Sequence, residues 1–329
     1  MRRVSGMRAV VLHSYGGPEV LTIEDVPDPT PGPEEVVVEV ASTALNRADM
    51  LQRMGLYPGP KMAYEIPGLE FSGRVAAVGE RASLWKVGDA VMAITGGGAY
   101  ASRLAIHERQ LMPVPSNVAL NDAAAIPEVF LTAWDALVVQ GGLTSGRWGL
   151  IHAGASGVGT AGIQIAKAIG ARIAVTCSSG KADAVRALGC DVVLERSPHD
   201  WLADAQAVVP GGFDAILDVI GADELNRNIT ALAPRGSIVQ VGTMEFGQPL
   251  INLGGLMMKR ARLIGTVLRA RPLEEKIALT RRFAAEILPL FEAGVLKPVI
   301  DSRFAFDEIA KAHERMGANL NVGKILIDL

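Results

Sequence analysis

Between residues 149 and 268 the sequence alternates short apolar runs with helical windows, and this alternation most limits how the chain can fold. Strands that alternate with helices in this way run parallel and are joined by right-handed crossovers. We therefore predict an α/β fold with a doubly wound parallel sheet in this region. The predicted strands are 148–153, 171–177, 215–219, 237–241 and 262–268, and the predicted helices are 159–170, 181–189 and 225–232.

The flanking segments have a different pattern. The first third contains β-rich runs separated by glycine and proline turns, which is typical of a small, curled β module. A helical window follows at 121–140, with Asn121 as its predicted N-cap. The chain ends with a predicted helix at 273–293 and a mixed segment at 303–329, which form either a third unit or part of the first. The β-rich runs are 7–12, 35–40 and 68–78.

Composition excludes several classes of protein. With 329 residues, 49% hydrophobic and 20% charged, the chain is typical of a globular protein of about two domains. Its formal net charge of -3 gives no overall attraction to nucleic acid or anionic lipid. Only Cys177 and Cys190 are present, too few for a disulfide framework. Without a secretory signal or a membrane-length apolar run, we expect a cytoplasmic protein with no nucleic-acid or membrane partner.

A glycine turn separates the first strand and helix of the alternating region. It reads Gly154-Ala-Ser-Gly-Val-Gly, with Ser156 where the second glycine of a G-x-G-x-x-G motif would stand. Such a turn lets the backbone approach a pyrophosphate, and the helix N-terminus offers free N–H groups. We predict a dinucleotide site at Gly154, Ser156, Gly157 and Val158. The alternative is an ordinary glycine turn.

The next strand ends in Ser178-Ser-Gly-Lys181, with no carboxylate to bind the ribose hydroxyls of NAD. Ser178 can donate a hydrogen bond and Lys181 carries a positive charge, so this segment favours NADPH as the cofactor. Arg196 follows the next strand and either completes the 2′-phosphate site or is a solvated surface arginine.

Seven motifs, in order along the chain, carry a resemblance. The sequence is similar to the medium-chain dehydrogenase/reductase superfamily, and within it to the zinc-independent, zeta-crystallin-like quinone oxidoreductases. The motifs are Pro31-Gly-Pro-Glu-Glu-Val-Val-Val-Glu-Val, Ala44-Leu-Asn-Arg-Ala-Asp, Gly68-Leu-Glu-Phe-Ser-Gly, Val87-Gly-Asp-Ala-Val, Ala123-Ala-Ala-Ile-Pro, Thr132-Ala-Trp and the turn at Gly154.

The resemblance implies a Rossmann NADPH-binding domain at 129–269, inserted into a GroES-like β-rich catalytic domain built from 1–128 and 270–329. It also implies a homodimer formed through the edge strand at 262–268. Further cofactor contacts carried over from the family are Thr132, Gly221, Gly242, Leu268 and Asn321.

The chain departs from the zinc-dependent branch of this family. Asn46 and Leu69 stand where that branch has a cysteine and a histidine ligand, and Gly96-Gly-Gly-Ala-Tyr replaces its cysteine-rich lobe. We expect no metal site, since the five histidines fall at no metal-ligand spacing. Without a Lewis acid to stabilise an alkoxide, reduction of an activated acceptor is the expected chemistry.

Two residues are the candidate catalytic groups. Asn46 is a neutral hydrogen-bond donor, and Tyr57 resembles the family's active-site tyrosine, as a proton donor or as a residue that lines the pocket. Glu70 is expected to be a structural partner for an arginine, and Arg47 and Asp49 to hold the loop by salt bridging. The predicted function is an NADPH-dependent reductase that transfers a hydride to quinones. The alternatives are an enone or enoyl reductase, and a non-enzymatic zeta-crystallin-like protein that binds the cofactor or RNA.

Overall fold

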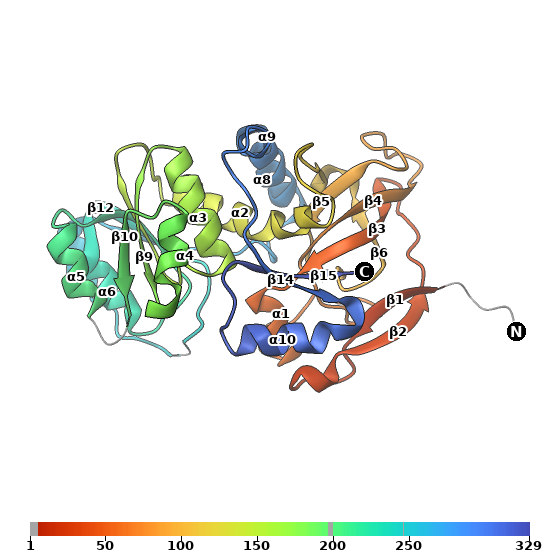
Figure 1. Ribbon diagram of the computed structural model, residues 1–329, viewed down its shortest axis with the longest axis horizontal. Helices are drawn as coiled ribbons and strands as arrows, with labels where there is room; N and C mark the ends of the chain where they lie inside the picture. Colours follow the sequence, from red (N-terminus) through yellow and green to blue (C-terminus); the bar gives the residue numbers. More distant parts are fainter. Residues whose placement is uncertain (1–5, 197–199, 246) are drawn as a thin grey trace, which may run out of the picture. The chain divides into compact units, whose positions relative to one another are not determined.

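The computed structural model describes residues 6–196, 200–245 and 247–329 (Figure 1). The chain divides into two compact units. Unit 1 contains Met1–Glu128 and Arg269–Leu329, and unit 2 contains Val129–Leu268. The chain end therefore returns to the first unit and does not form a third one.

Unit 2 is built on a six-stranded sheet in which all neighbouring strands are parallel. Its order is β10-β9-β8-β11-β12-β13, so the first strand in sequence lies at the centre and the order reverses beside it. The predicted doubly wound sheet is confirmed. The strands are β8 (Trp148–Ile151), β9 (Arg172–Cys177), β10 (Val192–Glu195), β11 (Phe213–Asp218), β12 (Leu232–Gln240) and β13 (Arg262–Gly265).

The helices of unit 2 connect these strands, and the core between helices and sheet is apolar. Buried residues such as Leu150, Ile216 and Ile238 come from the central strands, and Trp201 comes from a helix. Helix α3 contacts β8 and β9, and α4 contacts β10. The helices are α3 (Gly157–Ala168), α4 (Ala182–Ala187), α5 (Trp201–Val208), α6 (Glu224–Ala231) and α7 (Leu253–Lys259), with a 3₁₀ turn η5 (Ser179–Lys181) before α4.

The predicted helix 121–140 is wrong as a single element. It is a 3₁₀ turn η3 (Asp122–Ala125), helix α2 (Pro127–Trp134) and a π-helical segment η4 (Asp135–Gln140). Pro127 has no N–H to continue the preceding turn, but its fixed φ suits the first position of a helix. Asn121 does not cap the helix, because its side-chain Nδ2 donates to Asp328 Oδ1 at 2.8 Å.

Unit 1 is built on a seven-stranded sheet of order β14-β15-β3-β4-β5-β7, with β6 paired to β3. The last strand of the chain, β15, is antiparallel to β3. A separate two-stranded ribbon joins β1 and β2. The strands are β1 (Gly6–Val11), β2 (Thr22–Pro27), β3 (Glu35–Ala44), β4 (Glu70–Val78), β5 (Ala90–Ile94), β6 (Arg103–His107), β7 (Met112–Pro113), β14 (Ile300–Ala305) and β15 (Lys324–Asp328).

The helices of unit 1 are short except for one. The predicted helix 273–293 is interrupted at Ile287, and a second helix starts at Leu288 with Pro289, which lacks an N–H, in its first turn. The core is made by alternate residues of β3 and β4 such as Val36, Val38 and Phe71. The helices are α1 (Arg47–Arg53), α8 (Leu273–Glu286), α9 (Leu288–Glu292) and α10 (Ile309–Gly317), with 3₁₀ turns η1 (Pro18–Val20), η2 (Glu108–Gln110) and η6 (Phe306–Glu308).

Candidate active site

The turn after β8 requires glycine at two positions. A Cβ on Gly154 would lie 2.4 Å from the Cβ of Val175, and a Cβ on Gly159 would lie 2.4 Å from the carbonyl oxygen of Gly154. Ser156 stands in place of a further glycine because it is the N-cap of α3, where its Oγ accepts the N–H of Gly159 at 3.0 Å. The serine therefore supports the turn.

The start of α3 fits a pyrophosphate. Among the residues that the structure describes, the N–H groups of Gly157 and Val158 have no hydrogen-bond partner. Free amides at a helix N-terminus carry partial positive charge and bind anions. The turn also lies where the strand order reverses between β8 and β11, which is the usual ligand crevice of such sheets. The backbone here suits the cofactor that the sequence predicted.

The carboxyl end of β9 carries the predicted 2′-phosphate residues. Ser178 is exposed, and Lys181 is half-buried at the end of η5. The nearest carboxylate on the neighbouring strand belongs to Glu195, which is opposite Cys177 in the β9–β10 register. Arg196 is exposed, and its Nη2 lies 3.3 Å from Glu245 and 3.5 Å from Glu224. Because two carboxylates already balance its charge, the phosphate role of Arg196 stays a prediction.

The remaining cofactor candidates are divided between the units. Thr132 is half-buried on α2, and Gly221 follows β11 with a φ of 77° and an N–H donated to Asp218. Gly242 follows β12, and Leu268 is the last residue of unit 2. These residues share unit 2 with the glycine turn. Asn321 belongs to unit 1, where its Nδ2 donates to Gly323 O at 2.9 Å.

A buried histidine network beneath the glycine turn was not predicted from the sequence. His152 bonds Thr176 Oγ1 at 3.0 Å and Asn228 Oδ1 at 2.7 Å, and Asn228 donates in turn to Asp218. Burial lowers the pKa of His152, so the neutral ring makes these bonds. Since Asn228 presents its oxygen, the Nε2 of His152 is assigned as the donor. The network joins β8, β9, β11 and α6 and is structural.

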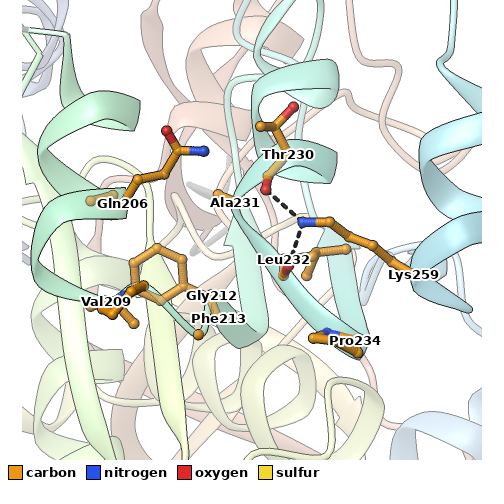
Figure 2. Close-up of a pocket in the computed structure, with 12 residues that line it drawn as sticks. Gln206, Val209, Gly212, Phe213, Thr230, Ala231, Leu232, Pro234 and Lys259 are labelled. Carbon is orange, nitrogen blue, oxygen red and sulfur yellow. Dashed lines mark hydrogen bonds between the residues drawn. The ribbon is translucent and has the colours of Figure 1, made fainter.

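Unit 2 also has a cavity of about 210 Å³, which Figure 2 shows beside Lys259. It is lined by Phe213 and Leu232, the first residues of β11 and β12, so it lies at the amino-terminal edge of the sheet. The Nζ of Lys259 donates to the carbonyl oxygens of Thr230 and Leu232. The glycine turn is at the opposite edge, so this cavity is separate from the nucleotide site.

In unit 1, Tyr57 stacks on an arginine that sequence reasoning missed. The guanidinium carbon of Arg269 lies 4.9 Å from the centre of the Tyr57 ring. Arg269 donates to Gly96 O at 2.7 Å and to Gln52 Oε1 at 2.6 Å, which fixes its plane. Burial raises the pKa of Tyr57, so the phenol keeps its proton and can donate a hydrogen bond.

Asn46, the other candidate catalytic residue, is already fully hydrogen-bonded. Its Nδ2 donates to Glu70 Oε1 at 2.8 Å and to Ala44 O at 3.2 Å, and its Oδ1 accepts from Lys324 Nζ at 2.7 Å. The residue is only 9% exposed. A substrate oxygen would receive a hydrogen bond from Asn46 only in exchange for one of these, and its catalytic role stays a prediction.

The partner of Glu70 is a lysine, which corrects the expected arginine. Glu70 and Lys324 are both buried, with 2.7 Å between Oε1 and Nζ. Lys324 also donates to Leu45 O at 2.8 Å, so each of its three ammonium hydrogens has an acceptor. Burial of the two charges together accounts for the pairing, because either one alone would be costly.

Within the described part of the chain, Arg47 and Asp49 do not form the expected salt bridges. Arg47 donates to Asn319 Oδ1 at 2.7 Å. Asp49 is buried and accepts the N–H of Asn46 at 2.8 Å and the hydroxyl of Tyr100 at 3.2 Å. Burial raises the pKa of Asp49 to about 6. It therefore holds the loop through neutral donors.

The described part of the chain has neither a metal cluster nor a membrane-spanning helix. Across residues 6–196, 200–245 and 247–329, no group of His, Cys, Asp and Glu side chains is arranged to hold a metal ion. In the same residues, no helix is both long enough and apolar enough to cross a membrane.

Comparison with known proteins decides the family. A model of the alcohol dehydrogenase GroES-like domain matches residues 32–116, and a model described as zinc-binding dehydrogenase matches residues 157–284. A quinone oxidoreductase of Pseudomonas aeruginosa is 34% identical over 95% of this chain and 97% of its own length. The chain belongs to the medium-chain dehydrogenase/reductase superfamily, in its zinc-independent, quinone-oxidoreductase-like branch. The resemblance that the motifs carry is thereby confirmed.

Solved structures of this superfamily share the fold. A quinone oxidoreductase from Pseudomonas syringae has a TM-score of 0.88 and 30% identity, covering 98% of this chain and 100% of that one. An NAD-dependent alcohol dehydrogenase has a TM-score of 0.89 and 31% identity, with the same coverage. The seven-stranded unit is GroES-like and the parallel-sheet unit is Rossmann-like. The chain is an oxidoreductase, and its family uses nicotinamide nucleotides.

Proposed function

We propose that this oxidoreductase is an NADPH-dependent reductase of quinones. The observation that carries the proposal is the donor set in unit 1: a proton-bearing Tyr57 held by Arg269, with Asn46 and Leu69 where the zinc-dependent branch has ligands. Hydrogen-bond donors stabilise the oxyanion that develops when a quinone is reduced. The quinone oxidoreductases of Pseudomonas among its relatives support the same acceptor class.

In the proposed reaction, the units divide the work. We assign cofactor binding to unit 2, with the amides of Gly157 and Val158 on the pyrophosphate, Gly221 on the adenine side, and Gly242 and Leu268 beside the nicotinamide. When bound, the reduced nicotinamide supplies a hydride. Tyr57 lines the substrate side of unit 1 and donates a hydrogen bond to the acceptor oxygen. Arg269 keeps the Tyr57 ring in place by stacking on it. This lowers the entropic cost of forming the hydrogen bond between Tyr57 and the acceptor.

The choice of NADPH depends on Ser178 and Lys181. We expect Lys181→Ala to weaken NADPH binding about tenfold and to leave NADH binding within about twofold, since a charged hydrogen bond contributes about 1.5–3 kcal/mol. Titration of nucleotide fluorescence measures both constants. Lys167→Ala is the matched control, because Lys167 pairs with Asp191 at 2.8 Å on another part of unit 2. Equal losses for the two nucleotides would refute the phosphate role.

Assays of turnover with different acceptors distinguish the proposed quinone reductase from its alternatives. Purified protein mixed with NADPH and an ortho-quinone should lose the absorbance of the reduced nicotinamide. Activity on an enone or enoyl thioester alone would favour the conjugated-carbonyl alternative. Absence of any turnover, with salt-dependent retention of RNA, would favour the non-enzymatic alternative.

We also propose that the chain forms a homodimer through the outer edge of the Rossmann-like sheet. β13 is an edge strand, and an unpaired edge is a template for another strand. Apolar side chains are exposed on it and on α7, including Leu263 at 39%, Met257 at 74% and Met258 at 83%. A second copy of the same edge would pair the strand and cover these side chains.

A further inference from the structure

The glycine turn after β8 begins with a residue in an unfavourable backbone conformation. Ala153 has a φ of 56°, in the left-handed region that costs free energy for a residue with a Cβ. Its N–H donates to Thr176 Oγ1 at 3.4 Å, and the N–H of Gly154 donates to Thr176 O at 2.8 Å. One threonine of β9 therefore holds the start of the turn that leads into α3.

Thr176 is itself fixed by a directional chain of hydrogen bonds between side chains. Because the neutral ring of His152 donates through Nε2 to Asn228 Oδ1 at 2.7 Å, its Nδ1 accepts the hydroxyl of Thr176 at 3.0 Å. Asn228 Nδ2 then donates to Asp218 Oδ2 at 2.9 Å. All four side chains are 0% exposed. Each donor points along the chain towards the Asp218 carboxyl group, so the bonds strengthen one another.

The chain ends at two more turns that carry predicted cofactor residues. Asp218 Oδ1 accepts the N–H of Ile220 at 2.6 Å and that of Gly221 at 3.1 Å, which fixes the turn after β11. Gln240 Nε2 donates to Asp218 O at 3.3 Å and to Gly242 O at 2.6 Å, which connects the turn after β12. The turns after β8, β11 and β12 are thus joined by hydrogen bonds at the carboxyl edge of the sheet.

We propose that His152 is a positioning residue for the nicotinamide nucleotide. The inference rests on the proposed function, which assigns the cofactor to these three turns, and deepens it. The two ring nitrogens of His152 connect the glycine turn to the Gly221 turn, and its ring packs edge-on against Trp201 with 5.1 Å between the ring centres. Since His152 is fully buried, it acts through the turns and not by contact with the nucleotide. Binding backbone that is already fixed reduces the ordering cost of binding a ligand.

The role of His152 differs from that proposed for Lys181 in which nucleotides it affects. The three turns are assigned to the pyrophosphate, the adenine side and the nicotinamide, and all of these are common to NADH and NADPH. Lys181 is assigned to the 2′-phosphate, which only NADPH carries. Loss of His152 should therefore weaken both nucleotides by the same factor, whereas loss of Lys181 should weaken NADPH alone.

His152→Leu tests this role, because it removes both ring nitrogens and keeps a side chain of comparable size. We expect the dissociation constants of NADPH and NADH each to rise about tenfold, the contribution of one hydrogen bond. His152→Gln, whose amide can still donate to Asn228, should recover most of the affinity. Thr176→Val removes only a hydroxyl from the same chain and should again weaken both nucleotides equally. Titration of nucleotide fluorescence measures all of these constants.

Phe213→Leu is the matched control for lost stability. Phe213 is buried in the same unit, but it begins β11 and so lies at the edge of the sheet opposite the glycine turn. The substitution should lower the urea midpoint of unfolding, as His152→Leu should, and leave both nucleotide affinities at wild-type values. If affinity falls with the unfolding midpoint in the control as well, His152 has no particular role in positioning.

Hydrogen exchange of the nucleotide-free protein gives a second readout. The amides of Ile220 and Gly221 donate to Asp218 and not to His152, yet they should exchange faster in His152→Leu and at the wild-type rate in Phe213→Leu. If His152→Leu binds both nucleotides as the wild type does, His152 is not a positioning residue, and the proposed function stands. If the wild type binds nucleotide but reduces neither quinones nor enones, the proposed function fails, and the binding measurements still decide the role of His152.

Discussion

At the scale of single residues, the contact between Tyr57 and Arg269 decides how the hydroxyl is presented. Arg269 is anchored by Gly96 and Gln52, and Gln52 is almost fully buried. The tyrosine ring therefore lies on a plane that is itself fixed. The stack depends on the ring and not on the hydroxyl, so the two can be separated by substitution.

Tyr57→Phe should lower kcat with quinones about 10- to 100-fold, the effect of losing one hydrogen bond to a developing charge. The unfolding free energy should change by less than about 1 kcal/mol, because the ring and its stack on Arg269 remain. Steady-state kinetics and urea unfolding measure the two effects. Tyr64→Phe is the control, since Tyr64 is exposed in the same segment. Unchanged kcat in Tyr57→Phe would remove Tyr57 from the mechanism.

The sequence predicted the role of a single residue more often than it predicted which residue it would contact. The glycine turn at Gly154 is recognisable because its spacing reports a backbone requirement. Glu70 and Lys324 stand near opposite ends of the chain, and only the folded sheet brings them together. Arg269 was missed because nothing in the spacing of residues shows that its guanidinium stacks on the ring of Tyr57.

At the scale of elements, the buried pair of Glu70 and Lys324 joins three parts of unit 1. Lys324 belongs to β15, Glu70 begins β4, and both bond Asn46 at the start of α1. The same glutamate accepts the N–H of Glu128 in α2. The ion pair of Glu70 and Lys324 thus fixes the start of α1, the helix that precedes Tyr57.

Lys324→Met should destabilise the protein by about 3–5 kcal/mol, because it leaves the charge of Glu70 buried without its cation. Adding Glu70→Gln should restore part of that loss. Urea unfolding of the single and double variants gives both values. Lys311→Met, which breaks an exposed pair with Glu308 at 2.8 Å, should cost less than about 1 kcal/mol. A single variant as stable as this control would show that the pair contributes little.

The strands of the parallel sheet could be predicted from the sequence, because a strand that is buried on both faces is a nearly continuous run of apolar residues. Helix ends were less predictable. Two windows that look continuous, 121–140 and 273–293, are broken just before Pro127 and Pro289, which lie in the first turns of α2 and α9. Each break depends on where one missing N–H falls. The pattern of side chains does not report that requirement.

At the scale of the whole molecule, the proposed homodimer can be tested through its edge. Light scattering at micromolar concentration should give the mass of two chains for the wild type and of one chain for Leu263→Lys, because a lysine would bury its charge against its symmetry mate. Leu84→Lys changes a leucine of similar exposure in unit 1 and should leave the dimer intact. A monomeric wild type would contradict the proposed interface.

The return of β15 to the sheet of unit 1 has a consequence for synthesis. On the side of β3 that does not pair with β4, residues 42–44 pair with β15, a strand that is translated after all of unit 2. Every residue of unit 2 emerges from the ribosome before that strand exists. Unit 2 can therefore fold first. Until β15 is made, the edge of β3 that β15 will cover stays unpaired and can pair with the wrong strand. The nascent chain is thus most exposed to aggregation in the interval between the translation of β3 and that of β15.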